Sequence, residues 1–368
     1  MIGDFSMLYS KRHLKGLPSP KEIVIKNLSD FMNLFSSGKF SDYIYRGEPT
    51  NYHNTISSAL RGGERPFIQM KNEYKREVFH KLTPDERKDF LAFAQHHGIP
   101  TNLIDFTRSP LVALFFACQP FSSDDDRFDN DRGFVYLIKN DLIDITDLLT
   151  GYEDDNFLMR FIRDEKDITI KLYKKFFEFD KRHPKTFYYY FRQLCDDWKY
   201  YFVDMQPLTP RRSRFPAYNN GEYRWKIRHK HIDEHPDIIR IIEQETGTVS
   251  LEVLEYTLML KNFLREIMAN QATVWWLNCI PNFIYTPFLA FERGINQQGL
   301  FVYQAYISFD EEVYDAHILS QQRVWPEYVI VIENKEKILK ELDFLGINDK
   351  FIYGDYDSIA RYIKQKYI

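Results

Sequence analysis

The stretch AQHHGIPTNLIDFTRSPLVALFFA, residues 94–117, sets two histidines, a threonine, an aspartate and an arginine between two apolar helical patterns. Thr101 and Asp105 are four residues apart in TNLID, so an extended backbone would place both side chains on one side. His97 ends a helical pattern, where the helix dipole favours a protonated imidazole. We interpret the stretch as a candidate binding site. The alternative is that Asp105 and Thr107 only cap the following helix.

Two further segments place polar groups at the ends of strand patterns. YRG at residues 45–47 closes an apolar strand, and Arg46 could hold a phosphate or carboxylate through two hydrogen bonds. The alternative is a surface ion pair between Arg46 and Glu48. Gln297 and Gln298 stand directly before GLFVY, where their amides could bind a ligand or form an ordinary loop.

Helices are predicted on both sides of TNLID. The first should run from about Pro84 to a stop at Gly98, and the second from Ser109-Pro110 to about Gln119, because proline favours the first helical position and glycine follows helix ends. The remaining pattern predicts strands at 42–48, 133–140, 298–307 and 327–334, and helices at 28–35, 335–346 and the C-terminus. Helices and strands mix without regular βαβ alternation, which predicts an α+β fold.

Residues 141–275 look helical and aromatic, and they contain a segment of different composition. Between Met205 and His231, seven lysines and arginines accompany a single glutamate. Within this segment YRWKIRHKH alternates strictly, which predicts a ribbon with one basic face. The face could bind nucleic-acid phosphates, or it could be a solvated hairpin. The candidate nucleic-acid-binding residues are Arg211, Arg212, Arg224, Lys226, Arg228 and Lys230.

Composition excludes several classes of protein. The net charge of −4 predicts no global attraction to nucleic acid or membranes. Three widely spaced cysteines without a CxxC pair argue against a zinc ribbon or a disulfide framework, and they fit a reducing cytoplasm. No nucleotide-binding glycine loop, HExxH or GxSxG motif occurs, so no metal cofactor is expected. No leader pattern or long apolar run is present, so we expect a cytoplasmic protein without membrane contact.

The three polar segments together resemble the FRG domain, a prokaryotic and phage module named for a Phe/Tyr-Arg-Gly motif. YRG at 45–47, the stretch at 94–117 and NQQGLFVY at 296–303 carry the resemblance. It covers roughly 22–140 and 276–368, which we expect to form the domain core. The stretch 141–275, with its basic ribbon at 205–231, then becomes a largely helical insertion.

The order of the motifs in this family is similar to that of ADP-ribosyltransferases, which cleave the nicotinamide–ribose bond of NAD through an oxocarbenium-like state. The resemblance implies a mixed or antiparallel sheet core of the ADP-ribosyltransferase kind, flanked by helices. It implies catalytic roles for Arg46, Asp105 and Gln298, and NAD binding by Tyr45, Arg46, Gly47, His97, Thr101 and Gln297. Transferases usually carry a glutamate at the third motif, where this chain has glutamine.

Three functions are therefore open. The first is an NAD-dependent ADP-ribosyltransferase-like effector, of toxin or antiphage type, that modifies a nucleic acid or a protein. The second is a nucleic-acid-binding or nucleic-acid-cleaving protein, and the third is a non-catalytic sensor module in phage defence. In the first case we expect Arg46, His97, Thr101, Asp105 and Gln298 to meet at one concave site.

Overall fold

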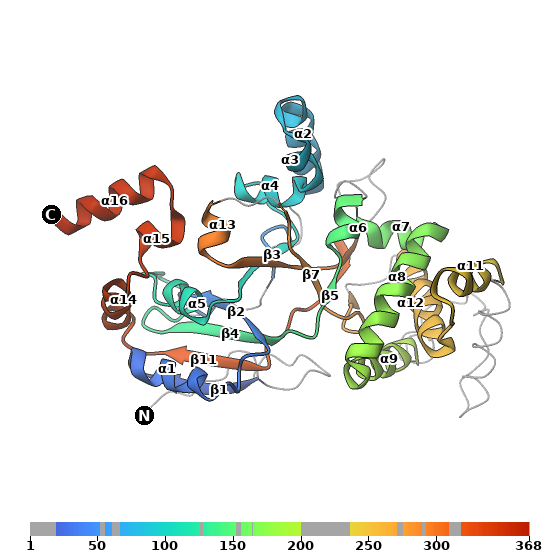
Figure 1. The fold of residues 1–368 in the computed structure, drawn as a ribbon, viewed down its shortest axis with the longest axis horizontal. Coiled ribbons are helices and arrows are strands. Elements are labelled where there is room, and N and C mark those ends of the chain that lie inside the picture. The colour runs from blue at the N-terminus through green and yellow to red at the C-terminus, as the bar shows by residue number, and fades with distance from the viewer. Residues whose placement is uncertain are drawn as a thin grey trace.

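The computed structural model describes residues 20–51, 56–60, 67–125, 128–151, 156–163, 165–199, 236–270, 275–288, 292–308 and 318–367. These residues form an α+β protein in which a mixed eight-stranded sheet lies beside a helical region (Figure 1). The α+β class predicted from the sequence is confirmed.

The large sheet has the strand order β1-β11-β4-β2-β3-β8-β7-β5. β1 pairs with β11 and β5 with β7 in parallel, and the other neighbours are antiparallel. The strands are β1 (Lys21–Ile25), β2 (Tyr43–Glu48), β3 (Leu103–Thr107), β4 (Gly133–Lys139), β5 (Ile143–Asp144), β7 (Phe283–Tyr285), β8 (Gly299–Tyr303) and β11 (Tyr328–Ile332).

The ladder of this sheet is nearly interrupted between β2 and β3. β2 pairs with β4 along its whole length, from Tyr43 to Glu48, and β3 pairs with β8 along its whole length. Between the described residues of β2 and β3, by contrast, the ladder consists of the single pair Tyr45–Thr107. Two half-sheets therefore meet at this pair, and we call the place the strand junction.

Three helices cover one face of the first half-sheet: α1 (Leu28–Ser36), α5 (Pro110–Ala117) and α14 (Lys335–Phe344). α5 lies against the backbone of the strands below it. A Cβ added at Gly47 would lie 1.8 Å from the carbonyl oxygen of Ala113, and one added at Gly133 would lie 1.9 Å from that of Ala117. Only glycine fits at these two positions, so the glycine of YRG serves helix packing.

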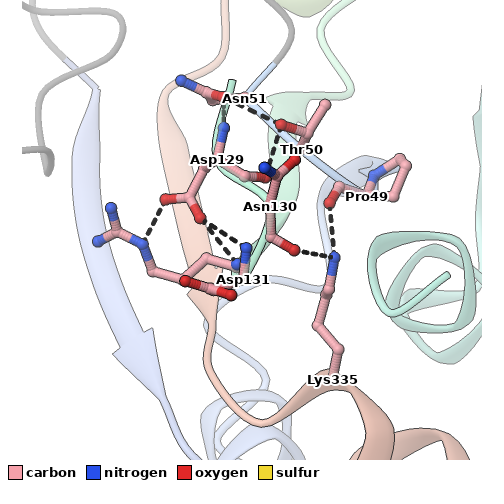
Figure 2. Close-up of polar contacts among 8 residues, drawn as sticks. Pro49, Thr50, Asn51, Asp129, Asn130, Asp131 and Lys335 are labelled. Atoms are coloured by element: carbon pink, nitrogen blue, oxygen red, sulfur yellow. Dashed lines mark hydrogen bonds and ion pairs between the residues drawn. The ribbon is translucent and has the colours of Figure 1, made fainter. Parts of the chain in front are cut away.

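Figure 2 shows how the chain leaving β2 is fixed to its neighbours. The Lys335 ammonium, at the start of α14, donates to the backbone carbonyls of Pro49 (2.9 Å) and Asn130 (3.3 Å). The Thr50 hydroxyl donates to the carbonyl of Asp129 at 2.8 Å. These contacts join the end of β2 to the loop that enters β4.

The helical region continues the core of the sheet. In it, the ring of Tyr256 contacts those of Phe176 and Phe187, with centroids 5.0 and 5.1 Å apart. Phe157 packs on Tyr303 of β8 with centroids 5.3 Å apart, so the predicted insertion shares one hydrophobic cluster with the sheet. The helices are α6 (Thr146–Gly151), α7 (Phe157–Ile162), α8 (Lys166–Arg182), α9 (Pro184–Lys199), α11 (Pro236–Thr246) and α12 (Leu251–Asn270).

The predicted single helix from Pro84 to Gly98 is wrong. α3 (Pro84–Lys88) and α4 (Phe90–His96) are separate helices, because Asp89 between them leaves helical geometry and accepts a hydrogen bond from the Tyr285 hydroxyl at 2.8 Å. The predicted stop is confirmed, since Gly98 has a φ of +85°.

The predicted strand at 298–307 is also divided. Gln304 interrupts it and separates β8 from β9 (Tyr306–Ser308), which pairs with β10 (Ile318–Gln321) in a small sheet completed by β6 (Trp275–Trp276). The remaining helices are α2 (Phe67–Val78), the 3₁₀ turn Phe79–Lys81, α13 (Glu292–Asn296), α15 (Asp349–Tyr353) and α16 (Tyr356–Tyr367).

The packing of α5 predicts the effect of Gly47→Ala. The new methyl group overlaps backbone that cannot move without lifting α5, so the free energy of unfolding should fall by about 3 kcal/mol. Gly151→Ala is the matched control, because a Cβ added there would meet nothing within 4 Å and the φ of Gly151 is not positive. Urea unfolding of both variants checks this, and a Gly47→Ala protein as stable as the control would contradict the packing argument.

The Asp197 carboxyl of α9 predicts a pH dependence of stability. Burial raises its pKa to about 7, with Asp196 adding to the rise and the Gln193 amide opposing it. The unfolded chain loses this proton near pH 4, so the folded form holds an extra proton between about pH 4 and 7. Stability from this group is therefore lost as the pH rises through about 7.

Asp197→Asn should remove that dependence and raise the thermal midpoint at about pH 8 above that of the unaltered protein. Thermal unfolding between about pH 5 and pH 8 measures it, with Asp124→Asn, an exposed position, as control. Equal pH slopes in all three proteins would refute the assignment.

Candidate functional site

Arg46 lies at the strand junction and is held by two contacts. Its Nε donates to Glu48 Oε1 at 2.8 Å, and its Nη1 donates to the backbone carbonyl of Asp105 at 2.8 Å. The side chain of Arg46 is 15% exposed and that of Glu48 is 2% exposed. The ion pair considered from the sequence exists, but it is buried rather than on the surface. The hydrogen bond from Arg46 to the Asp105 carbonyl links β2 to β3 where their ladder ends.

Aromatic side chains flank Arg46 on its face of the sheet. Tyr136 of β4 is its cross-strand partner and is buried. The antiparallel register that pairs Tyr45 with Thr107 brings Phe106 opposite Arg46 on the other side. Arg46 therefore lies between two buried aromatic side chains.

A second polar group lies around Asp105, the exposed residue of β3. Asp105 Oδ1 accepts a hydrogen bond from the side-chain amide of Gln95 at 2.9 Å. The carbonyl of the same amide accepts one from the Thr101 hydroxyl, which in turn accepts from the backbone N–H of Leu103 at 3.3 Å. Gln95, Thr101 and Asp105 therefore form a continuous chain of hydrogen bonds, which we call the Gln95 relay.

Asp105 does not cap the following helix. Ser109 is the N-cap of α5, and its hydroxyl accepts from the backbone N–H of Val112 at 3.3 Å. Thr107 supports this turn by accepting from the N–H of Ser109 at 2.9 Å. Neither Asp105 nor Thr107 therefore caps α5, although Thr107 supports the turn that precedes the helix.

The side chains of Arg46 and Asp105 point to opposite faces of the sheet. Tyr45 and Thr107 are a direct pair, so they share one face, and alternation turns Arg46 away from it while keeping Asp105 on it. The contact between the two residues is therefore from side chain to backbone. Tyr45 and Gly47 lie on the α5 side, where burial raises the pKa of the Tyr45 hydroxyl to about 12.

His97 follows the last turn of α4 and is exposed. Its ring contacts Phe93 of the preceding turn, with centroids 4.4 Å apart, and meets His96 edge-on at 5.1 Å. His97 thus stands two residues beyond Gln95, at the same end of α4 as the Gln95 relay.

The segment of Gln297 and Gln298 is fixed to the end of β3. The Gln297 carbonyl accepts from the Thr107 hydroxyl at 2.6 Å, and the Gln298 carbonyl accepts from the N–H of Arg108 at 3.1 Å. The Gln297 amide donates to the carbonyl of Ile352 at 3.2 Å. Gln298 is exposed and has a φ of +46°, uncommon for a residue other than glycine.

The sequence pattern indicates Glu48 as a partner of Arg46 but misses its burial, and it misses the role of Gln95. Glu48 looked like a surface group, because burial of its carboxylate follows from the sheet and not from its neighbours along the chain. Gln95 stands among apolar residues in the last turn of α4, and that exception to an apolar pattern was the available signal.

The remaining predictions concern the basic face, metal binding and membrane contact. The basic residues Arg211, Arg212, Arg224, Lys226, Arg228 and Lys230 lie outside the described residues. Within the described ranges, no group of three or more His, Cys, Asp or Glu side chains could hold a metal ion. No helix in those ranges is long and apolar enough to cross a membrane.

Comparison with known families supports the family resemblance of the motifs. The model of the FRG domain matches residues 41–126, which include β2, α4, β3 and α5. The chain therefore carries an FRG domain at these residues, and Arg46, the Gln95 relay and the α5 contact all fall inside it. No curated protein and no solved structure matches the chain.

The buried pair predicts a stability effect of Arg46→Ala. Removing the guanidinium leaves the Glu48 carboxylate buried without this charge partner, so the free energy of unfolding should fall by about 3 kcal/mol. Adding Glu48→Gln to that variant removes the buried negative charge that Arg46 paired with and should restore part of the loss.

Lys340→Ala is the control, because its ion pair with Glu336 is exposed on α14 and should contribute almost nothing to stability. Urea unfolding of the four proteins gives the comparison. An Arg46→Ala loss no greater than that of the control would show that the pair contributes nothing to the fold.

Proposed function

We propose that the chain is an NAD-dependent, ADP-ribosyltransferase-like effector, of toxin or antiphage type, that acts through its FRG domain. The observation that carries the proposal is the position of the three motif segments. They lie on the adjacent antiparallel strands β2, β3 and β8, in the order that the resemblance to transferases implies. Arg46 donates to the backbone carbonyl of Asp105 across the strand junction, so the segments that carry the two residues are joined there, although their side chains lie on opposite faces of the sheet.

The reaction needs charge of both signs. The bond between the nicotinamide nitrogen and ribose C1′ breaks, its electron pair leaves with nicotinamide, and the ribose takes on oxocarbenium character. The acceptor then forms a bond to C1′ and releases its proton to a base. A fixed carboxylate near C1′ stabilises the developing cation more than water does, because it needs no reorganisation.

Asp105 is the group best suited to that role. Its carboxylate is exposed, and the Gln95 relay holds one of its oxygens. The position of Asp105 compensates for the neutral Gln298 at the third motif, which would then hold a ribose hydroxyl by hydrogen bonding. Arg46, whose side chain lies on the other face of the sheet, would support the site through its hydrogen bond to the Asp105 backbone. The exposed His97 would complete the surroundings of the ligand, while the buried Thr101 would act through Gln95.

The acceptor we propose is a nucleic acid, with a protein as the alternative. The support comes from the basic segment 205–231, because seven cationic side chains with interleaved aromatic residues suit a phosphate backbone with unstacked bases.

The proposal predicts that the purified protein releases nicotinamide from NAD and that Asp105→Asn slows the release by about 100-fold. Asparagine keeps a hydrogen-bond acceptor but removes the charge, and Ser109 rather than Asp105 caps α5, so the melting temperature should hardly change. Gln298→Glu adds the charge that transferases carry and should raise the rate. Chromatographic measurement of nicotinamide, with nucleic acid or cell lysate as acceptor, provides the test.

One outcome would count against the enzyme, and another would remove the support for Asp105. If neither the unaltered protein nor Gln298→Glu releases nicotinamide with any acceptor, the FRG domain is a binding or sensing module. If Asp105→Asn is inactive only because it melts early, the loss says nothing of catalysis. Circular dichroism on the same samples separates these cases.

A further inference from the structure

The hydrogen bonds of the Gln95 relay have a fixed direction. The Thr101 hydroxyl oxygen accepts from the N–H of Leu103, so its proton is directed at the Gln95 carbonyl oxygen. The Gln95 amide is thereby oriented with its N–H₂ group toward Asp105 Oδ1. The reverse orientation would bring the amide oxygen against the carboxylate, and two acceptors repel one another.

The direction of the hydrogen bonds in the Gln95 relay determines which hydrogen bonds Asp105 can make. An amide N–H₂ can only donate, so Asp105 Oδ1 is an acceptor in this arrangement. The other oxygen, Oδ2, has no hydrogen-bond partner among the described residues, and Asp105 is exposed. Oδ2 therefore presents a fixed acceptor to solvent.

We propose that Gln95 is a positioning residue that keeps Asp105 as an oriented, proton-accepting carboxylate, and that the ligand group which meets Oδ2 is a hydroxyl donor of a ribose. The inference deepens the proposed function and rests on it for the identity of the ligand. The orientation of the carboxylate by Gln95 stands on the hydrogen bonds alone.

Gln95→Met tests the positioning role, because methionine has nearly the same shape without the amide. If Gln95 acts through Asp105 in the transition state, kcat for nicotinamide release should fall by about tenfold while KM hardly changes. Thr101→Val should act in the same direction, since the amide loses the hydroxyl that orients it. Thr101→Ser keeps the hydroxyl and should retain most of the rate.

Gln95→Glu provides a readout that a purely structural residue would not give. At neutral pH the introduced carboxylate faces Asp105, and two like charges repel one another. As the pH falls, the introduced carboxyl takes up a proton and can donate it to Asp105 Oδ1 as the amide did. The rate relative to the unaltered protein should therefore recover between about pH 8 and pH 5.

Nuclear magnetic resonance supplies a test that needs no turnover. The hydrogen-bonded proton of the Gln95 side-chain amide should exchange with water more slowly than the amide of Gln365, which lies exposed on α16. Asp105→Ala should abolish that protection. ADP-ribose should shift the Gln95 amide resonance, whereas ADP, which lacks the second ribose, should not. Gln365→Met is the matched control for Gln95→Met.

The outcomes separate this inference from the proposed function. Gln95 protection that disappears in Asp105→Ala, in a protein that releases no nicotinamide, would retain the positioning role and reject the enzyme. Equal exchange of the Gln95 amide in both proteins would overturn the positioning role, as would a Gln95→Met enzyme with an unchanged kcat and no pH recovery in Gln95→Glu. A response to ADP equal to that for ADP-ribose would overturn the ribose assignment.

Discussion

Helix α5 lies on β2 and β4 at backbone contact, and most of the site depends on that constraint. Gly47 and Gly133 leave no room for a Cβ beneath the carbonyls of Ala113 and Ala117. Because the two strands are paired along β2, the helix can occupy only one position over them. Its first residue, Pro110, then determines where β3 must end, and β3 carries Asp105.

A second constraint joins the large sheet to the small one through buried amides. The Gln304 side chain accepts from the N–H of Ser57 at 2.9 Å and donates to the carbonyl of Gln322 at 2.7 Å. The Asn102 amide donates to the Gln304 carbonyl at 2.9 Å. These side chains are almost fully buried, and their hydrogen bonds offset the cost of removing them from water. Asn102 directly precedes β3, so the network fixes the start of that strand as α5 fixes its end.

Helices and strands whose ends or faces are marked by residues within the same segment could be predicted from the sequence. Proline after Ser109, glycine at 98 and the alternation in each strand determine structure within a few residues, and α5, β2, β4 and the stop of α4 were predicted correctly. The break at Asp89 depends on Tyr285, which lies 196 residues away. Local patterns do not contain such a partner. The division of the strand at Gln304 has the same cause, because its amide partners come from other segments.

The same limit applies to the site. The motif residues suggested that Arg46 and Asp105 would act from one side, but the faces of a sheet are decided by register, and the single pair Tyr45–Thr107 turns the two side chains apart. Burial of Glu48 follows from pairing with β4, which begins 85 residues later along the chain. Sequence patterns can identify residues with the right chemistry, whereas their common geometry depends on contacts between distant segments.

Asp105 is the residue at which stability and the proposed function make different demands. The other four residues of β3 are buried, and an aspartate at the centre of a short strand has a low strand propensity. A buried apolar residue at this position would extend the core over Phe301, its partner on β8. The chain instead keeps an exposed carboxylate there and commits Gln95 and Thr101 to orienting it. A polar residue that a strand keeps against its local preference, with neighbouring side chains hydrogen-bonded to it, is a candidate for ligand binding, and this is the physical basis of the role we propose for Asp105.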